Sequence, residues 1–93
     1  MQLGDVIAQL EDEAAADEAL MALGDLTLVN RVAAAASGEA MTRGEFVAAC
    51  VGRFAAQCSD ELWLTMIGQM AQTEFPGQVL LRRALETALS ARA

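Results

Sequence analysis

Apolar residues along this chain recur every three or four positions, which is the spacing of one face of an α-helix. No stretch alternates apolar and polar residues with the β-branched or aromatic content of a strand, so the sequence predicts no strands. The acidic run at 11–13 interrupts the first apolar stripe, and the pattern then resumes either as a second helix or after a kink. The two parts of this pattern are Leu3, Val6, Ile7 and Leu10, then Ala14, Leu20, Met21 and Leu23.

Capping signals divide the middle of the chain. Gly24 breaks the pattern, and Asp25 is expected to cap a helix whose apolar stripe runs from Leu26 to Ala36. Gly38 then stands where a left-handed residue commonly ends a helix. The next helix has the best-marked start: Thr42 and Glu45 form a capping box, and Met41 and Phe46 are spaced as a hydrophobic staple. Its predicted apolar face is Phe46, Val47, Cys50, Val51, Phe54 and Cys58.

Two more helices follow. Ser59 is expected to cap the first, with Asp60 and Glu61 in the turn where the helix dipole favours anions. Pro76 suits the first position of the last helix because proline has no N–H to lose there. The apolar stripes predicted for these helices are Trp63, Met66, Ile67 and Met70, flanked by Leu62 and Leu64, and then Val79, Leu81, Leu85, Ala88 and Leu89.

This pattern predicts an all-α fold, a compact single-domain bundle of five to six short helices covering residues 1–93. The helix pairs at 13–37 and 42–72 are similar in length and leave a solenoid repeat as an alternative, although they share no motif.

Composition adds two expectations. Apolar residues make up 55% of the chain, an excess for so small a volume, so some apolar surface is expected to remain exposed and to support a homodimer. No apolar run reaches the length of a transmembrane helix, and the acidic start lacks the features of a signal peptide. We therefore expect a cytoplasmic protein with no membrane partner. Cys50 and Cys58, eight residues apart on one predicted helix, are too distant to form a disulfide with each other.

The missing residue types limit the chemistry. The chain has no histidine, tyrosine or lysine, which excludes Ser-His-Asp and Cys-His catalysis and histidine-containing zinc or di-iron sites built from this chain alone. Cys50 lies among apolar residues, and Cys58 has only Arg53 as a basic neighbour in sequence, so neither is expected to be an activated nucleophile. We expect no enzyme activity, no cofactor and no metal site.

Charge is concentrated at one end. Residues 1–25 contain seven acidic residues and no basic one, whereas residues 26–93 hold six acids and six arginines, so the whole net charge of −7 falls on the first quarter. This segment is the predicted docking face for a basic protein partner; an ordinary solvated helix face, or a hard cation shared by Glu13 and Asp17, are the alternatives. The predicted docking residues are Glu11, Asp12, Glu13, Asp17 and Glu18.

Nucleic-acid binding is not expected. Arg82 and Arg83 form the only basic doublet, and we expect them to pair with the acidic first quarter, within the chain or across a dimer. The helices predicted near 42–57 and 60–72 resemble a helix-turn-helix in spacing only. The second helix begins with two acids and carries no arginine, so phosphates would repel it.

Leu62, Trp63, Met66 and Met70 are the predicted core or interface anchors. Gly68 lies among them and suggests a close helix–helix approach, since a mid-helix glycine costs about 1 kcal/mol relative to alanine. The resulting hypothesis is a non-enzymatic protein–protein interaction module, a homodimeric regulatory or accessory subunit. The alternative is a helical protein that binds a small apolar ligand beside Trp63.

Overall fold

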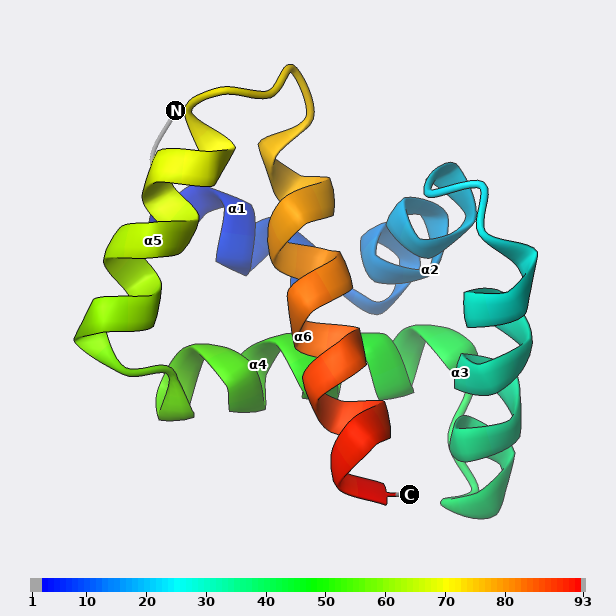
Figure 1. Cartoon of the computed structure of the whole chain (residues 1–93). Helices are drawn as coiled ribbons and strands as arrows, with labels where there is room; N and C mark the ends of the chain where they lie inside the picture. The colour runs from blue at the N-terminus through cyan, green and yellow to red at the C-terminus, as the bar shows by residue number, and fades with distance from the viewer. Residues whose placement is uncertain (1–2, 93) are drawn as a thin grey trace.

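Residues 3–92, which the computed structural model describes, form six α-helices and no strand (Figure 1). This confirms the all-α class and the expected number of helices. The break at 11–13 separates two helices rather than kinking one. The elements are α1 (Leu3–Leu10), α2 (Glu13–Ala22), α3 (Leu26–Gly38), α4 (Arg43–Gln57), α5 (Asp60–Met70) and α6 (Pro76–Arg92).

The predicted helix starts are confirmed by their hydrogen bonds. The Thr42 hydroxyl accepts from the Glu45 N–H at 3.1 Å, and the Glu45 carboxylate accepts from the Thr42 N–H at 2.9 Å, which completes the capping box. Asp25 caps α3, Ser59 caps α5, and Pro76 is the first residue of α6. These short-range contacts depend only on residues within one turn of each other, which is why the sequence shows them.

The end of α3 differs from the prediction. Gly38 still belongs to the helix, and the left-handed residue is Ala40, with φ of 58°. The Met41 N–H bonds to the Ala36 carbonyl at 2.9 Å and the Ala40 N–H to the Ser37 carbonyl at 3.2 Å, the paired closure of a Schellman motif. This closure returns Met41 to the edge of the core, where it is half-buried.

α4 is the central element of the bundle. It contacts α1, α2, α3 and α6, and α6 crosses in front of it in Figure 1. α5 lies at one side and packs mainly against α6. The largest fully buried side chains come from five of the six helices: Leu20, Val32, Val47, Val51, Met66, Leu80, Leu81 and Leu85.

α6 buries a wider face than its sequence pattern predicted. Leu80 and Ala84, which were not assigned to its apolar side, are almost completely buried, whereas Val79 and Ala88 are only half-buried. The reason is that α6 packs against helices on several sides. Within residues 3–92, no helix is both long enough and apolar enough to cross a membrane.

α2 and α4 approach each other closely at Gly44. A Cβ atom at this position would collide with the carbonyl oxygen of Glu13. Gly44 is buried and lies in the first turn of α4. The crossing of these two helices therefore requires glycine at this position, which sequence reasoning did not identify.

Candidate functional site

The four predicted anchors on α5 separate into two pairs. Met66 is fully buried and Met70 is 8% exposed, so both belong to the core of this chain. Leu62 and Trp63 are half-buried at its edge. The Trp63 ring meets the Phe54 ring edge to face, with centroids 6.3 Å apart and an interplanar angle of 83°. The tryptophan thus attaches the start of α5 to the end of α4.

The outer face of α5 is apolar and uncovered. Leu64 is 72% exposed and Ile67 46% exposed, although Ile67 was predicted on the same stripe as Met66. A Cβ atom built on Gly68 would have no neighbour within 4 Å, so the predicted close helix approach is wrong within this chain. The physical reason is that α5 has one main neighbour, α6, and a helix with one neighbour buries only a narrow stripe.

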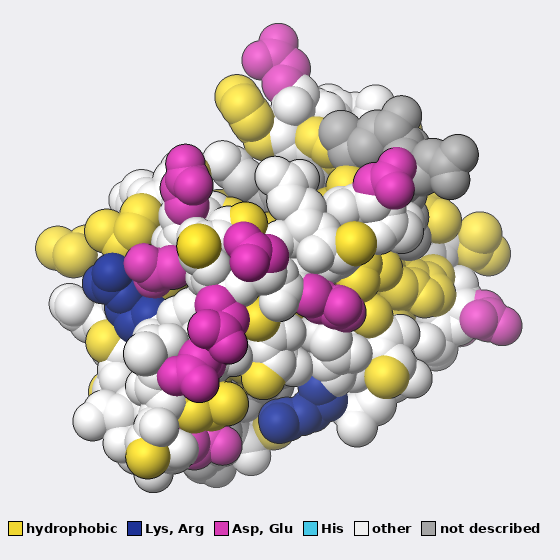
Figure 2. All heavy atoms as spheres, turned by 180° about the vertical axis from the view of Figure 1, so that it is seen from behind, with side chains coloured by type: hydrophobic (Ala, Val, Ile, Leu, Met, Phe, Trp, Pro, Cys, Tyr) yellow, Lys and Arg dark blue, Asp and Glu magenta, His cyan; other side chains and the backbone are white. Residues whose placement is uncertain are grey.

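The predicted acidic face lies around the junction of α1 and α2. The four residues Glu11, Asp12, Glu13 and Glu18 are exposed. Figure 2 shows the molecule from behind, where acidic side chains far outnumber the arginines. Asp12 also has a structural role, because its carboxylate caps α2 by accepting from the Ala15 N–H at 3.1 Å.

The fifth predicted docking residue, Asp17, is engaged within the chain. Both of its carboxylate oxygens bond to the Arg43 guanidinium, at 3.0 and 3.2 Å, which joins α2 to α4. The charge of Asp17 is therefore already compensated within the chain by Arg43. Among the described residues, no group of three potential metal ligands lies together. Nothing in the local sequence pointed to this pair, whose members are 26 positions apart.

Arg82 pairs with the acidic first quarter, as predicted. Its guanidinium donates to the Asp25 carboxylate at 3.1 Å, linking α6 to the start of α3. The pKa of Asp25 is lowered from its ordinary value of 3.8, first by the backbone N–H of Leu28 and then by Arg82. Within residues 3–92, Arg83 forms no ion pair.

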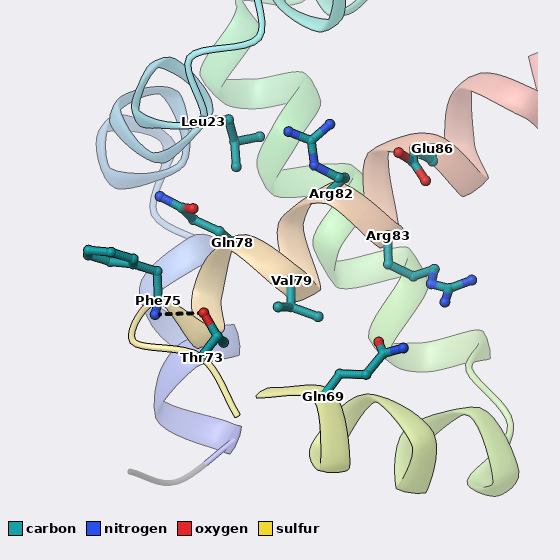
Figure 3. Close-up of a pocket in the computed structure, with 9 residues that line it drawn as sticks. All are labelled: Leu23, Gln69, Thr73, Phe75, Gln78, Val79, Arg82, Arg83 and Glu86. Carbon is teal, nitrogen blue, oxygen red and sulfur yellow. Dashed lines mark hydrogen bonds between the residues drawn. The ribbon is translucent and has the colours of Figure 1, made fainter. Parts of the chain in front are cut away.

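A groove of about 420 Å³ opens beside these arginines on the outer side of α6 (Figure 3). We call it the α6 groove. Leu23, Phe75 and Val79 supply its apolar lining, and its charged lining consists of Arg82, Arg83 and the acid Glu86. Phe75 is 61% exposed. Sequence reasoning identified the arginine doublet but not this phenylalanine, because its exposure depends on how α5 and α6 are joined.

A second groove, of about 350 Å³, lies where α4, α5 and α6 meet. Its apolar lining includes Phe54 and Leu62, and both cysteines contribute to its walls. Cys50 is buried, as expected for a small core residue, and Cys58 is half-buried with its thiol 3.5 Å from the Ser59 carbonyl. We call this the α4–α5 groove.

Comparisons with protein-family models, with curated proteins and with solved structures found no match to this chain. Its function must therefore be inferred from the surfaces described above.

Proposed function

We propose that this protein is a non-enzymatic interaction module, a homodimeric regulatory or accessory subunit that binds a basic protein partner. The observation that carries the proposal is uncompensated charge. Of the acids at 3–25 in the described chain, only two form an ion pair with an arginine: Asp17 with Arg43 and Asp25 with Arg82. Glu11, Glu13 and Glu18 are exposed and unpaired, so a basic surface could neutralise them with little rearrangement.

The outer face of α5 supports the homodimer. Leu64 and Ile67 are among the few large apolar side chains that remain exposed. Gly68, which lies between this pair and Ala71 in the sequence, has no side chain and leaves space for a second helix to approach. A second copy of α5 packed there would cover this apolar surface. The proposal includes a cytoplasmic location, because two cysteines that are too far apart in one helix to bridge each other fit a reducing compartment.

Affinity capture with paired variants tests the acidic docking face. The variant E11Q/E13Q/E18Q removes three charges from this face, and D60N/E61Q/E74Q removes three from exposed positions elsewhere. The expected result is a basic protein from the source organism that binds the native chain and the second variant but not the first. Equal capture by all three proteins would refute the proposed face.

The α4–α5 groove favours a second candidate, binding of a small apolar ligand. Phe54 lines this groove and also contacts Trp63, so a ligand against Phe54 would change the tryptophan environment. Tryptophan fluorescence titrated with a chemically varied set of hydrophobic compounds would test it. A saturable spectral shift would favour ligand binding, and no response from any compound would exclude this candidate.

A further inference from the structure

We propose that the α6 groove binds an acidic peptide segment of a second partner protein. One carboxylate of the peptide would pair with Arg83, and apolar side chains about one and two helical turns away would cover Val79 and Phe75. This site is separate from the acidic face of the proposed function and has the opposite charge preference.

The apolar half of the site is held in place by local structure. Phe75 precedes Pro76, the first residue of α6, and its N–H donates to the Thr73 hydroxyl at 3.2 Å. The ring is therefore attached to an ordered turn while remaining 61% exposed. Val79 and Leu23 are half-buried around it. Aromatic and arginine side chains together are typical of the residues that dominate binding energy at protein interfaces.

The charged half of the site has N–H donors available to bind an anion. Arg82 is anchored by Asp25 at 3.1 Å, and most of its N–H donors remain free of this bond. Arg83 has no ion pair within the described chain, and Figure 3 shows its side chain extending away from Glu86. The first turn of α6 contains no acidic residue, so its dipole also favours a negative group near Phe75.

The net charge of −7 does not prevent this binding. The groove lining carries two arginines, Arg82 and Arg83, against one acid, Glu86, and Arg82 is already paired with Asp25. Charges in physiological salt are screened beyond about 8 Å, so acids farther from the groove than this act on it only weakly.

A peptide fits this groove better than a nucleic acid does. Nucleic-acid affinity comes mainly from many phosphate contacts, and the groove supplies only two arginines, one already paired. Its exposed phenylalanine and half-buried aliphatic side chains instead match a ligand that has both an acid and an apolar group.

Fluorescence anisotropy with a panel of short labelled peptides would test the proposal. The peptides carry glutamate and leucine at varied helical and extended spacings, and matched peptides carry lysine in place of glutamate. We expect at least one glutamate peptide to bind the native protein and its lysine counterpart not to bind. R83E and F75A should each weaken binding at least tenfold, and R31E, a charge reversal at an exposed arginine outside the groove, less than threefold.

Several outcomes would overturn the proposal. They are no binding by any glutamate peptide, equal loss of affinity in R83E and R31E, or displacement of the peptide by a duplex DNA of equal charge, which would indicate a nucleic-acid surface instead. Circular dichroism of each variant confirms that it is folded, and R83E and F75A are expected to fold because both side chains are exposed. The result is independent of the acidic docking face, because E11Q/E13Q/E18Q should bind the same peptide with unchanged affinity.

Discussion

At the scale of single residues, Ala40 is the clearest case of backbone strain. It has φ of 58°, a conformation in which an L side chain with a Cβ atom is strained and glycine is not. Replacing it should therefore stabilise the protein. We expect A40G to raise the free energy of unfolding by about 1 kcal/mol, measured by urea denaturation.

The control for this variant is the same replacement within the helix. Ala34 is exposed in the interior of α3, where glycine lowers helix propensity by about 1 kcal/mol. A34G should therefore destabilise the protein while A40G stabilises it. Destabilisation by both variants would show that Ala40 does not occupy the left-handed region.

At Gly44, by contrast, replacing glycine with alanine is expected to destabilise the protein. The missing side chain of Gly44 lets the backbone of α4 lie against Glu13, and a Cβ atom would collide with a carbonyl group that cannot move without shifting α2. We expect G44A to lower the free energy of unfolding by about 1–3 kcal/mol. Thermal and urea unfolding measured together would give this value.

Gly52 in the same helix is the matched control. A Cβ atom there would meet only the Glu11 carboxylate oxygen, at an ordinary 3.7 Å. G52A should therefore be neutral or stabilising by up to about 1 kcal/mol, because alanine is the better helix former. Equal destabilisation by G44A and G52A would contradict the close crossing of α2 and α4.

At the scale of the helices, the sequence predicted where each helix begins better than it predicted which helix faces are buried. Caps at Asp25, Thr42 and Ser59 depend on residues three positions away, so they can be recognised without knowing the fold. The burial of α5 and α6 depends on how many helices surround each one, which the sequence does not show. For this reason Ile67 was assigned to a buried stripe and Leu80 was not assigned to one, and both assignments were wrong.

The candidate sites also divide into features that the sequence shows directly and features that depend on how the helices pack. The excess of acid at 1–25 and the doublet at Arg82 and Arg83 can be read directly from the sequence. The pairing of Arg43 with Asp17 could not be, because it depends on the crossing of α2 and α4. Long-range ion pairs therefore decide which of the acids remain available to a partner.

The ion pair between α3 and α6 predicts a dependence of stability on pH. The pKa of Asp25 is lowered in the folded state, so folding favours its deprotonated form. The resulting stabilisation is present above the ordinary value of 3.8 and is lost as the pH falls through the lowered pKa. D25N keeps a capping side chain without the charge, so it should be less stable than the native chain at neutral pH and approach it in acid.

R82Q separates the two main causes of this shift. The Leu28 N–H, which is the larger cause, remains in this variant, and only the contribution of Arg82 is lost. Unfolding by urea across the acidic range should therefore show a smaller change for R82Q than for D25N. If both variants matched the native chain at every pH, Asp25 would not be coupled to folding.

At the scale of the whole molecule, the three candidate surfaces lie mainly on different elements. The acids of α1 and α2, the α6 groove and the outer face of α5 can each be occupied without covering the same residues. A small chain with separate surfaces of different chemistry is suited to holding partners together. The α4 helix contacts four other helices and α6 contacts all five, so these two helices connect the elements that carry the three surfaces.

The proposed homodimer gives the prediction at this scale. Leu64 and Ile67 are exposed, so L64E/I67E should cost the monomer little stability while placing charge in the proposed α5 interface. Sedimentation equilibrium at micromolar concentration should show a dimer for the native chain and a 9.8 kDa monomer for the variant. L26E, at a 70% exposed leucine on α3, should remain a dimer. Because each copy carries a charge of −7, added salt should strengthen the native dimer by screening repulsion, whereas a native chain that is monomeric at every salt concentration would refute the α5 interface.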